Sequence, residues 1–287
     1  MTTDAAGATF DGQLLPLVWD PVDPDRLRCE LTSNMVRPDG ALFGGAALAA
    51  TLSAFEHVTD RPAAYATVQF VSSARFGEHL EARVERVAHG RTVDQLQISA
   101  WSDDRLVFSG LGATATRKEG GLTGVGIVPP RVVPPEDCET WGRAAQEAPI
   151  GHHRVSEYRS APILDPDPAR PGHMAMWGRV HYGATTTSAK LGYLADMVPI
   201  AVSRAAGVLG AGTSLDNTVR IGQHVDSEWI LIELEGQLAV GGFGHGVTHL
   251  WTREGTLLAT GTQTSKLFSF DELQTRLMTG DGGVADG

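Results

Sequence analysis

One apolar stretch dominates the hydrophobic pattern of the chain, at residues 188–207. It reads SAKLGYLADMVPIAVSRAAG, and its apolar residues leave no wide polar face on a helix. A helix that is apolar all round is a buried helix, and a stretch of this length favours a helix over a strand. Pro199 lacks an amide hydrogen and therefore predicts a kink. We expect a kinked, buried helix here.

Asp196 stands in the middle of this predicted helix, just before Pro199. A buried carboxylate is unfavourable unless other groups satisfy it or the protein uses it. Asp196 therefore either caps the turn that restarts at Pro199 or takes part in a function.

The rest of the pattern is mostly β-strand, and it occurs twice. In the first half, the Gly- and Ala-rich stretch 41–57 predicts a helix. Alternating segments then predict strands, and the same order follows the helix of the second half. The predicted strands are 65–71, 80–87, 92–101 and 106–116 in the first half, and 217–221, 229–239, 246–251 and 257–268 in the second.

The two halves are related by an offset of 150 to 151 positions. Trp101-Ser-Asp-Asp-Arg105 resembles Trp251-Thr-Arg-Glu-Gly255, and residues 66–70 fall on residues 217–221. The chain therefore contains one α+β unit twice. A long helix wrapped by a curved antiparallel sheet describes the hotdog fold. We expect a tandem, or double, hotdog whose two sheets join edge to edge, because this covers exposed strands.

Changes in composition predict the domain boundaries. Residues 1–118 form the first predicted hotdog domain, and residues 151–274 form the second. Between them, residues 119–150 are rich in Gly and Pro and keep no period, which is typical of a linker. Residues 275–287 are predicted to be a flexible, solvated tail.

The repeat allows the polar residues of the two halves to be compared. Ser214, just before a predicted strand, falls on an alanine of the first half, and Gln263, within a strand, falls on a glycine. The predicted helix of the first half offers no ionisable residue opposite Asp196. We interpret these three residues as a functional set that the second domain carries and the first has lost.

Composition excludes several classes of function. The chain has 287 residues, of which 42% are hydrophobic and 20% charged, as in an ordinary globular protein with room for two domains. A net charge of −11 argues against a nucleic-acid surface. No run of about 18 apolar residues predicts a membrane span. The two cysteines form no CxxC pair, and no signal peptide is evident, so we expect a cytoplasmic protein.

Five motifs of the chain resemble those of the acyl-CoA thioesterase II family, the TesB-like double-hotdog thioesterases. The resemblance covers nearly the whole chain. The motifs are Phe43-Gly-Gly45, Arg83-Val-Glu-Arg-Val-Ala-His-Gly-Arg-Thr92, Leu191-Gly-Tyr-Leu-Ala-Asp196, Thr213-Ser-Leu-Asp-Asn-Thr218 and Ala259-Thr-Gly-Thr-Gln263.

This resemblance implies hydrolysis of acyl-CoA thioesters to free fatty acid and CoA. The family's catalytic Asp, Thr or Ser, and Gln fall on Asp196, Ser214 and Gln263. The hydroxyl residue is Ser here, where the best-known members have Thr. The chain shows no GxSxG elbow and no Cys–His pair for a covalent mechanism. We expect Asp196 to accept a proton from the attacking water, which Ser214 and Gln263 hold, while backbone N–H groups near the helix break polarise the carbonyl.

Other residues are candidates for substrate binding. Tyr193, Met197 and Ile200 on the helix are expected beside an acyl tunnel, although each also fits a plain core position. Gly242, in a Gly-rich loop, and Arg91, in a turn, are candidates for contacts with CoA. The alternatives are a simple hairpin turn for Gly242, which a Gly-rich loop favours, and a solvated side chain for Arg91.

No metal and no cofactor are expected, apart from the CoA that belongs to the substrate. His245 and His249 are four positions apart on a predicted strand, which separates them by roughly 13 Å, too far to share one metal ion. The resemblance also implies a role in fatty acid and lipid metabolism and a homo-oligomer of double-hotdog units.

Two other functions remain open. A non-catalytic acyl-CoA or acyl-carrier binding protein could have the same fold, because fold does not imply function. An enoyl-CoA hydratase of the hotdog type commonly pairs an Asp with a nearby His, but residues 197–207 contain no His. Thioester hydrolysis separates an esterase from a binding protein.

Overall fold

The computed structural model describes residues 14–142, 148–182 and 185–269. The predicted tail at 275–287 lies outside these residues. Both halves contain a helix followed by a run of long strands, as the pattern predicts. The elements of the first half are β1 (Val18–Trp19), β2 (Arg26–Glu30), α1 (Gly44–Thr59), β3 (Ala63–Phe70), β4 (His79–His89), β5 (Val93–Ser102) and β6 (Arg105–Ala115). Those of the second half are β7 (Ser156–Ser160), β8 (His173–Val180), α3 (Ser188–Leu194), α4 (Val198–Ala205), β9 (Gly210–Ile221), β10 (Ile230–Val240), β11 (Phe243–Thr252) and β12 (Leu257–Ser269).

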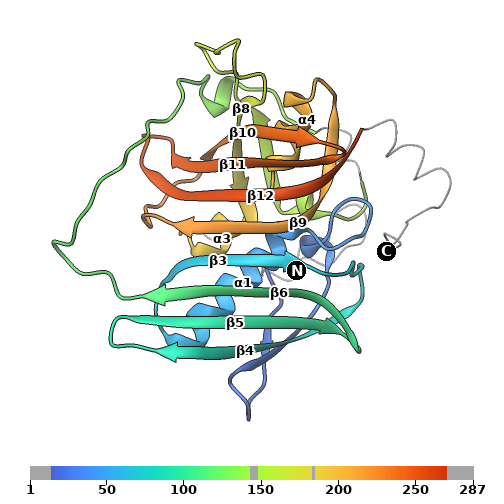
Figure 1. Ribbon diagram of the computed structural model, residues 1–287, viewed down its shortest axis with the longest axis vertical. Helices are drawn as coiled ribbons and strands as arrows, with labels where there is room; N and C mark the ends of the chain where they lie inside the picture. The colour runs from blue at the N-terminus through green and yellow to red at the C-terminus, as the bar shows by residue number, and fades with distance from the viewer. Residues whose placement is uncertain (1–13, 143–147, 183–184, 270–287) are drawn as a thin grey trace.

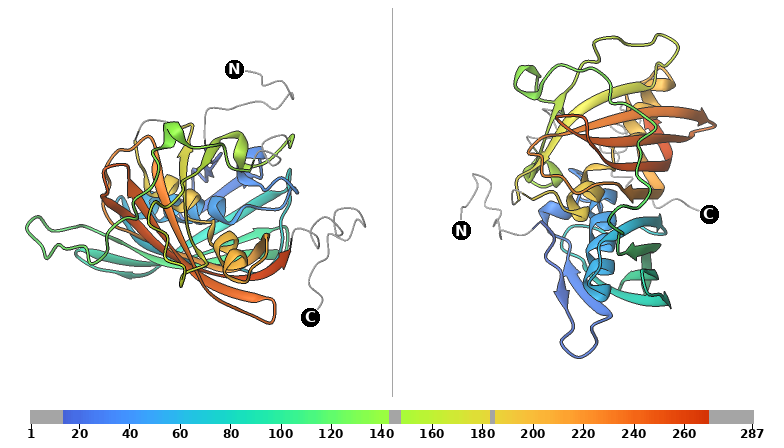
Figure 2. Two further views of the ribbon diagram at one scale, coloured as in Figure 1. Left: turned by 90° about the horizontal axis from the view of Figure 1, so that it is seen from above. Right: turned by 90° about the vertical axis from the view of Figure 1, so that its left-hand side faces the viewer.

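All these strands belong to one curved antiparallel sheet, in the order β1-β2-β4-β5-β6-β3-β9-β12-β11-β10-β8-β7 (Figure 1). The helices lie inside its curve, as the view from above shows (Figure 2). The first-half strands occupy one end of the sheet and the second-half strands the other. This is the tandem hotdog that the repeat predicts.

The two halves meet where β3 pairs with β9. Thr67 lies opposite Thr218, its equivalent 151 positions later, and their hydroxyl oxygens are 3.0 Å apart. The seam therefore brings equivalent residues of the two repeats face to face. The prediction that the two sheets join edge to edge is confirmed.

Small residues allow α1 to pack closely against its neighbours. A Cβ atom on Gly45 would lie 2.3 Å from the carbonyl oxygen of Tyr193 in the second half. A Cβ on Gly112 of β6 would lie 2.7 Å from the ring of Phe55 on α1. Atoms this close would overlap, so both the contact between the halves and the packing of the sheet on α1 depend on glycine.

The predicted single helix at 188–207 is two helices in the structure, which corrects that prediction. α3 ends at Leu194 and α4 begins at Val198. Pro199 has no amide hydrogen to continue the helical hydrogen bonds, so the chain breaks before it. Residues 195–197 make the break, and Asp196 lies at its centre.

Candidate active site

The Asp196 side chain leaves the helix break and points toward the first half of the molecule. α4 has Met197 as its N-cap and receives no side-chain capping bond there. One carboxylate oxygen of Asp196, Oδ2, instead accepts a hydrogen bond of 2.8 Å from the backbone amide of Gly45. The explanation of Asp196 as a cap for the restarted helix is therefore wrong.

The other carboxylate oxygen, Oδ1, faces the sheet of the second half. It accepts hydrogen bonds from Gln263 Nε2 at 2.5 Å and from Asn217 Nδ2 at 3.0 Å. Ser214 Oγ is more distant, at 3.5 Å, and accepts a bond of 2.6 Å from Gln263 Nε2. The structure thus brings together the three residues that the sequence predicts and adds Asn217.

Two neighbouring strands hold these polar side chains. Gln263 on β12 pairs directly with Asn217 on β9, so both side chains point to the same face of the sheet. Ser214 lies inside β9, not before it as predicted, and a register shift between Thr264 and Ser265 accompanies it. The Gly-, Ala- and Ser-rich start of β9 is a weak strand signal, but pairing with β12 extends the strand to Gly210.

The first half contributes its backbone to this site. Gly45 is 151 positions before Asp196 and is therefore its equivalent in the repeat. A Cβ atom on the neighbouring Gly44 would lie 2.6 Å from Asp196 Oδ2. Phe43 is the N-cap of α1, and the two glycines are its first residues. Gly44 leaves room for the carboxylate of the other half, and Gly45 donates its amide to that carboxylate.

The environment of Asp196 makes it a candidate general base. Burial raises the pKa of the carboxyl from 3.8 to about 6, although hydrogen bonds from Gly45, Gln263 and Asn217 and the charge of Arg37 oppose the rise. A base with a pKa near 6 is largely ionised at neutral pH and still accepts a proton readily. Burial therefore outweighs the hydrogen bonds in setting this pKa.

Asn217 is the site residue that sequence reasoning missed. Subtracting the offset of 151 places it on Ala66, so it is a polar residue with an apolar equivalent, as Ser214 and Gln263 are. It is 1% exposed, which is unusual for an amide side chain. The comparison of the two repeats contained the signal that would have found it.

An aromatic wall lies beside the glycines of α1. The His152 ring stacks on Phe43 with a centroid distance of 4.1 Å and meets Tyr158 and Tyr193 edge-on. Burial lowers the pKa of His152 to about 3, so this ring is neutral at physiological pH. The Tyr193 hydroxyl donates a bond of 2.5 Å to the Asn34 carbonyl.

The residues predicted to line an acyl tunnel are well packed. Tyr193 is 0% exposed and Met197 is 5% exposed, while Ile200 on α4 is half-buried. The sheet of the second half lies directly on α4, because a Cβ on Gly246 would be only 2.8 Å from Val198. Their role in substrate binding stays a prediction.

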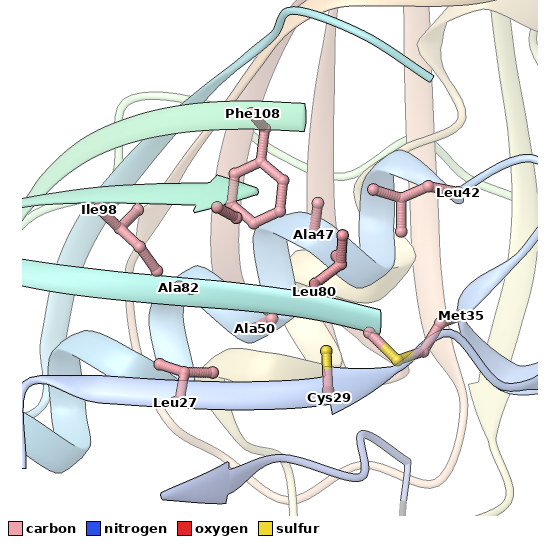
Figure 3. A pocket seen from close by; sticks show the side chains of 11 residues that line it. Leu27, Cys29, Met35, Leu42, Ala47, Ala50, Leu80, Ala82, Ile98 and Phe108 are labelled. Atoms are coloured by element: carbon pink, nitrogen blue, oxygen red, sulfur yellow. The ribbon is translucent and has the colours of Figure 1, made fainter. Parts of the chain in front are cut away.

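An apolar cavity occurs in the first half, between α1 and the sheet (Figure 3). Its volume of about 10 Å³ is close to that of one water-sized sphere, which is too small for an acyl chain. It is lined by Leu27, Cys29, Met35, Leu42, Ala47, Ala50, Leu80, Ala82, Ile98, Ala100 and Phe108.

Gly242 and Arg91 lie in exposed turns at opposite ends of the sheet. Gly242 has a φ of 82° in the turn between β10 and β11, and its carbonyl accepts a bond from the Leu267 amide. The Arg91 carbonyl, in the turn between β4 and β5, accepts a bond from Arg61. Gly242 is four positions from Gly246, the partner of Gln263 on β11, about 13 Å along the strand. Contacts of either residue with CoA stay predictions.

The described residues contain no group of three or more His, Cys, Asp or Glu side chains placed to hold a metal ion. No helix among them is long and apolar enough to cross a membrane.

Two family models match the chain, one over each half. Residues 32–117 match the family model of the acyl-CoA thioesterase N-terminal domain, and residues 135–266 match that of the C-terminal domain. The chain belongs to the acyl-CoA thioesterase family. The two matched ranges follow the two halves of the fold, and the second contains Asp196, Ser214, Asn217 and Gln263.

Solved structures share this fold. A candidate thioesterase from Novosphingobium aromaticivorans is 30% identical, with a TM-score of 0.77 over 90% of this chain and 99% of that one. The acyl-CoA thioesterase II TesB2 of Mycobacterium marinum is 18% identical, with a TM-score of 0.72 over 89% and 97%. A hotdog-fold protein of unknown function from Alicyclobacillus acidocaldarius is 20% identical, with a TM-score of 0.73 over 93% and 97%. No curated protein matches this acyl-CoA thioesterase family member.

Proposed function

We propose that the protein hydrolyses acyl-CoA thioesters to a free fatty acid and CoA. The observation that supports this most strongly is the convergence of four hydrogen-bond donors, from both halves, on Asp196. A carboxylate held in this way has a fixed direction and a pKa suited to accepting a proton near neutral pH.

Asp196 acts as the general base in the proposed reaction. Oδ2 accepts one bond, from Gly45, and keeps a lone pair for the attacking water, while the donors of the sheet surround Oδ1. The water oxygen attacks the thioester carbonyl carbon as its proton passes to Asp196. The carbon–sulfur bond then breaks, and CoA leaves as a thiolate that takes up the proton.

The other groups position the water and polarise the carbonyl. Ser214 and Gln263 hold the water beside the carboxylate. Backbone N–H groups at the break before α4 stabilise the oxyanion, as amides at the start of a helix do. The acyl chain passes Tyr193, Met197 and Ile200, which requires these packed side chains to move.

The resemblance to the acyl-CoA thioesterase family extends this proposal to a wider role. The protein would act in fatty acid metabolism in the cytoplasm as a homo-oligomer, with no cofactor beyond the CoA of its substrate.

Release of free thiol from a panel of acyl-CoAs, short to long, tests the proposal. We expect the wild type to release CoA and to show a chain-length preference. The folded Asp196→Asn variant should lose at least about a hundredfold in kcat/KM, because general bases contribute 10²–10⁴-fold. Binding of acyl-CoA without any thiol release by the wild type would favour a binding protein instead.

A further inference from the structure

The site contains a second amide that the predicted catalytic set does not use. Asn217 donates to the same Asp196 oxygen as Gln263 and lies directly opposite Gln263 in the paired strands. Both amide side chains are 1% exposed. The carboxylate is therefore held between two buried amides of neighbouring strands.

Each of these amides keeps a free acceptor. Asn217 Oδ1 and Gln263 Oε1 are buried and have no hydrogen-bond partner among the described residues. A buried, unpaired acceptor costs about 1–3 kcal/mol, so such groups call for a functional explanation. Two free acceptors beside a carboxylate suit a ligand with more than one O–H or N–H donor. A water molecule has two.

We propose that Asn217 is a positioning residue for thioester hydrolysis, which fixes Asp196 through its amide nitrogen and holds the attacking water through its amide oxygen. This inference rests on the proposed function. The water donates one O–H to Asp196 Oδ2, where its proton is transferred, and the other O–H to an amide oxygen. Its oxygen lone pair is then directed at the thioester carbonyl.

The fold itself does not require an amide at this position. β9 pairs with β12 and β3 through backbone hydrogen bonds, to which the Asn217 side chain contributes nothing. The equivalent position of the first half holds Ala66, which is equally buried on the paired strand β3. The hydrogen bonds of Asn217 therefore serve Asp196 rather than the sheet.

The charges near Asp196 keep the same state across the relevant pH range. Arg37 contributes the positive charge of its guanidinium. Burial raises the pKa of the Tyr158 hydroxyl, so this group stays neutral. Gly45, Ser214 and Gln263 contribute only uncharged donors. A change in the titration of Asp196 can thus be attributed to the substituted residue.

The test compares Asn217→Ala and Asn217→Asp with a control, Thr262→Val. Thr262 neighbours Gln263 on β12, and its side chain points to the other face of the sheet. For each protein, kcat/KM for acyl-CoA hydrolysis and thermal stability are measured between about pH 4 and about pH 9. The stability series reports the titration of Asp196 even where no hydrolysis occurs.

We expect Asn217→Ala to lower kcat/KM at least about tenfold. The midpoint of the rise of kcat/KM with pH should move upward by about one pH unit, since the ionised form of Asp196 loses a hydrogen-bond donor. Asn217→Asp should move this midpoint further, because two carboxylates about 3 Å apart resist joint ionisation. Thr262→Val should keep the wild-type profile.

An unchanged midpoint in both Asn217 variants would overturn the inference, whatever their thermal stability. Absence of hydrolysis by the wild type would contradict the proposed function instead. In that case the stability series still decides whether Asn217 controls Asp196.

Discussion

Asp196 is a carboxylic acid in a largely buried position, which does not favour the stability of the fold. The residue as a whole is partly exposed, but protein groups surround its carboxylate, and burial raises the pKa of this group to about 6. The folded state therefore holds a proton that the unfolded state releases near pH 4. The contribution of Asp196 to stability must fall as the pH rises through this window, because its carboxyl binds more protons in the native state than in the unfolded state.

The first prediction concerns this pH dependence. Relative to Asp196→Asn, the wild type should lose stability between about pH 4 and about pH 7, by at most about 3 kcal/mol for a shift of two pKa units. Partial exposure reduces this figure. Chemical denaturation of both proteins across the range measures it. A difference that is constant with pH would show that the pKa of Asp196 is not raised.

The second prediction concerns Gly44. In Gly44→Ala, the new Cβ would lie 2.6 Å from Asp196 Oδ2, so the carboxylate must move. Because small displacements of catalytic groups are costly, we expect kcat/KM to fall at least about tenfold. Gly124→Ala is the control, since its Cβ would meet no atom within 4 Å. Equal activity of the two variants would show that the carboxylate can occupy another position.

Comparison of the two halves of the sequence predicts three of the four polar side chains at the site. Asp196, Ser214 and Gln263 stand out because the first half has no equivalent polar group. Gly45 could not be found in this way, because it acts through its backbone amide, and every residue except proline has one. Its importance depends on the contact between the halves, which no pattern along the chain describes.

At the scale of the elements, the site depends on a broken helix facing an intact one. Apolar periodicity predicts a single helix at 188–207, but Pro199 divides it into α3 and α4. The strand lengths were harder to predict, because the start of β9 is poor in strand-forming residues. Pairing with β12 overrides this local preference and brings Ser214 into the strand.

The third prediction tests the close approach of α1 and α3. Gly45→Ala would place a Cβ 2.3 Å from the Tyr193 carbonyl oxygen, and a backbone atom cannot rotate away. We expect a loss of about 1–3 kcal/mol, the usual effect of overpacking, although alanine favours a helix more than glycine does. Gly126→Ala, in open space, is the matched control. Denaturant unfolding of both variants measures the difference. A more stable Gly45→Ala protein would contradict the close packing.

At the scale of the whole molecule, the two halves form one structure rather than two independent domains. β3 and β9 pair through five residue pairs, and Ser188 donates a bond of 2.6 Å to Glu56 on α1. The double hotdog was predictable from the repeat. The position of the site at the seam was not, because the sequence placed all its residues in the second half.

The fourth prediction concerns the linker. Residues 119–127 are exposed, and the seam rather than the linker holds the halves together. A protease site inserted at Thr123 and then cleaved should leave two fragments that elute as one particle and keep the activity of the uncut protein. Size-exclusion chromatography and thiol release measure both properties. Separation of the fragments after cleavage would show that the covalent connection is essential.

The pH dependence of kcat/KM for acyl-CoA hydrolysis tests the central claim most directly. If Asp196 is the general base, kcat/KM should rise with pH to a plateau, with a midpoint near its pKa of about 6. In Asp196→Asn this limb should disappear together with most of the activity. A wild-type kcat/KM that is constant from about pH 5 to about pH 8 would contradict the account. So would a rise of kcat/KM with pH in Asp196→Asn that matches that of the wild type.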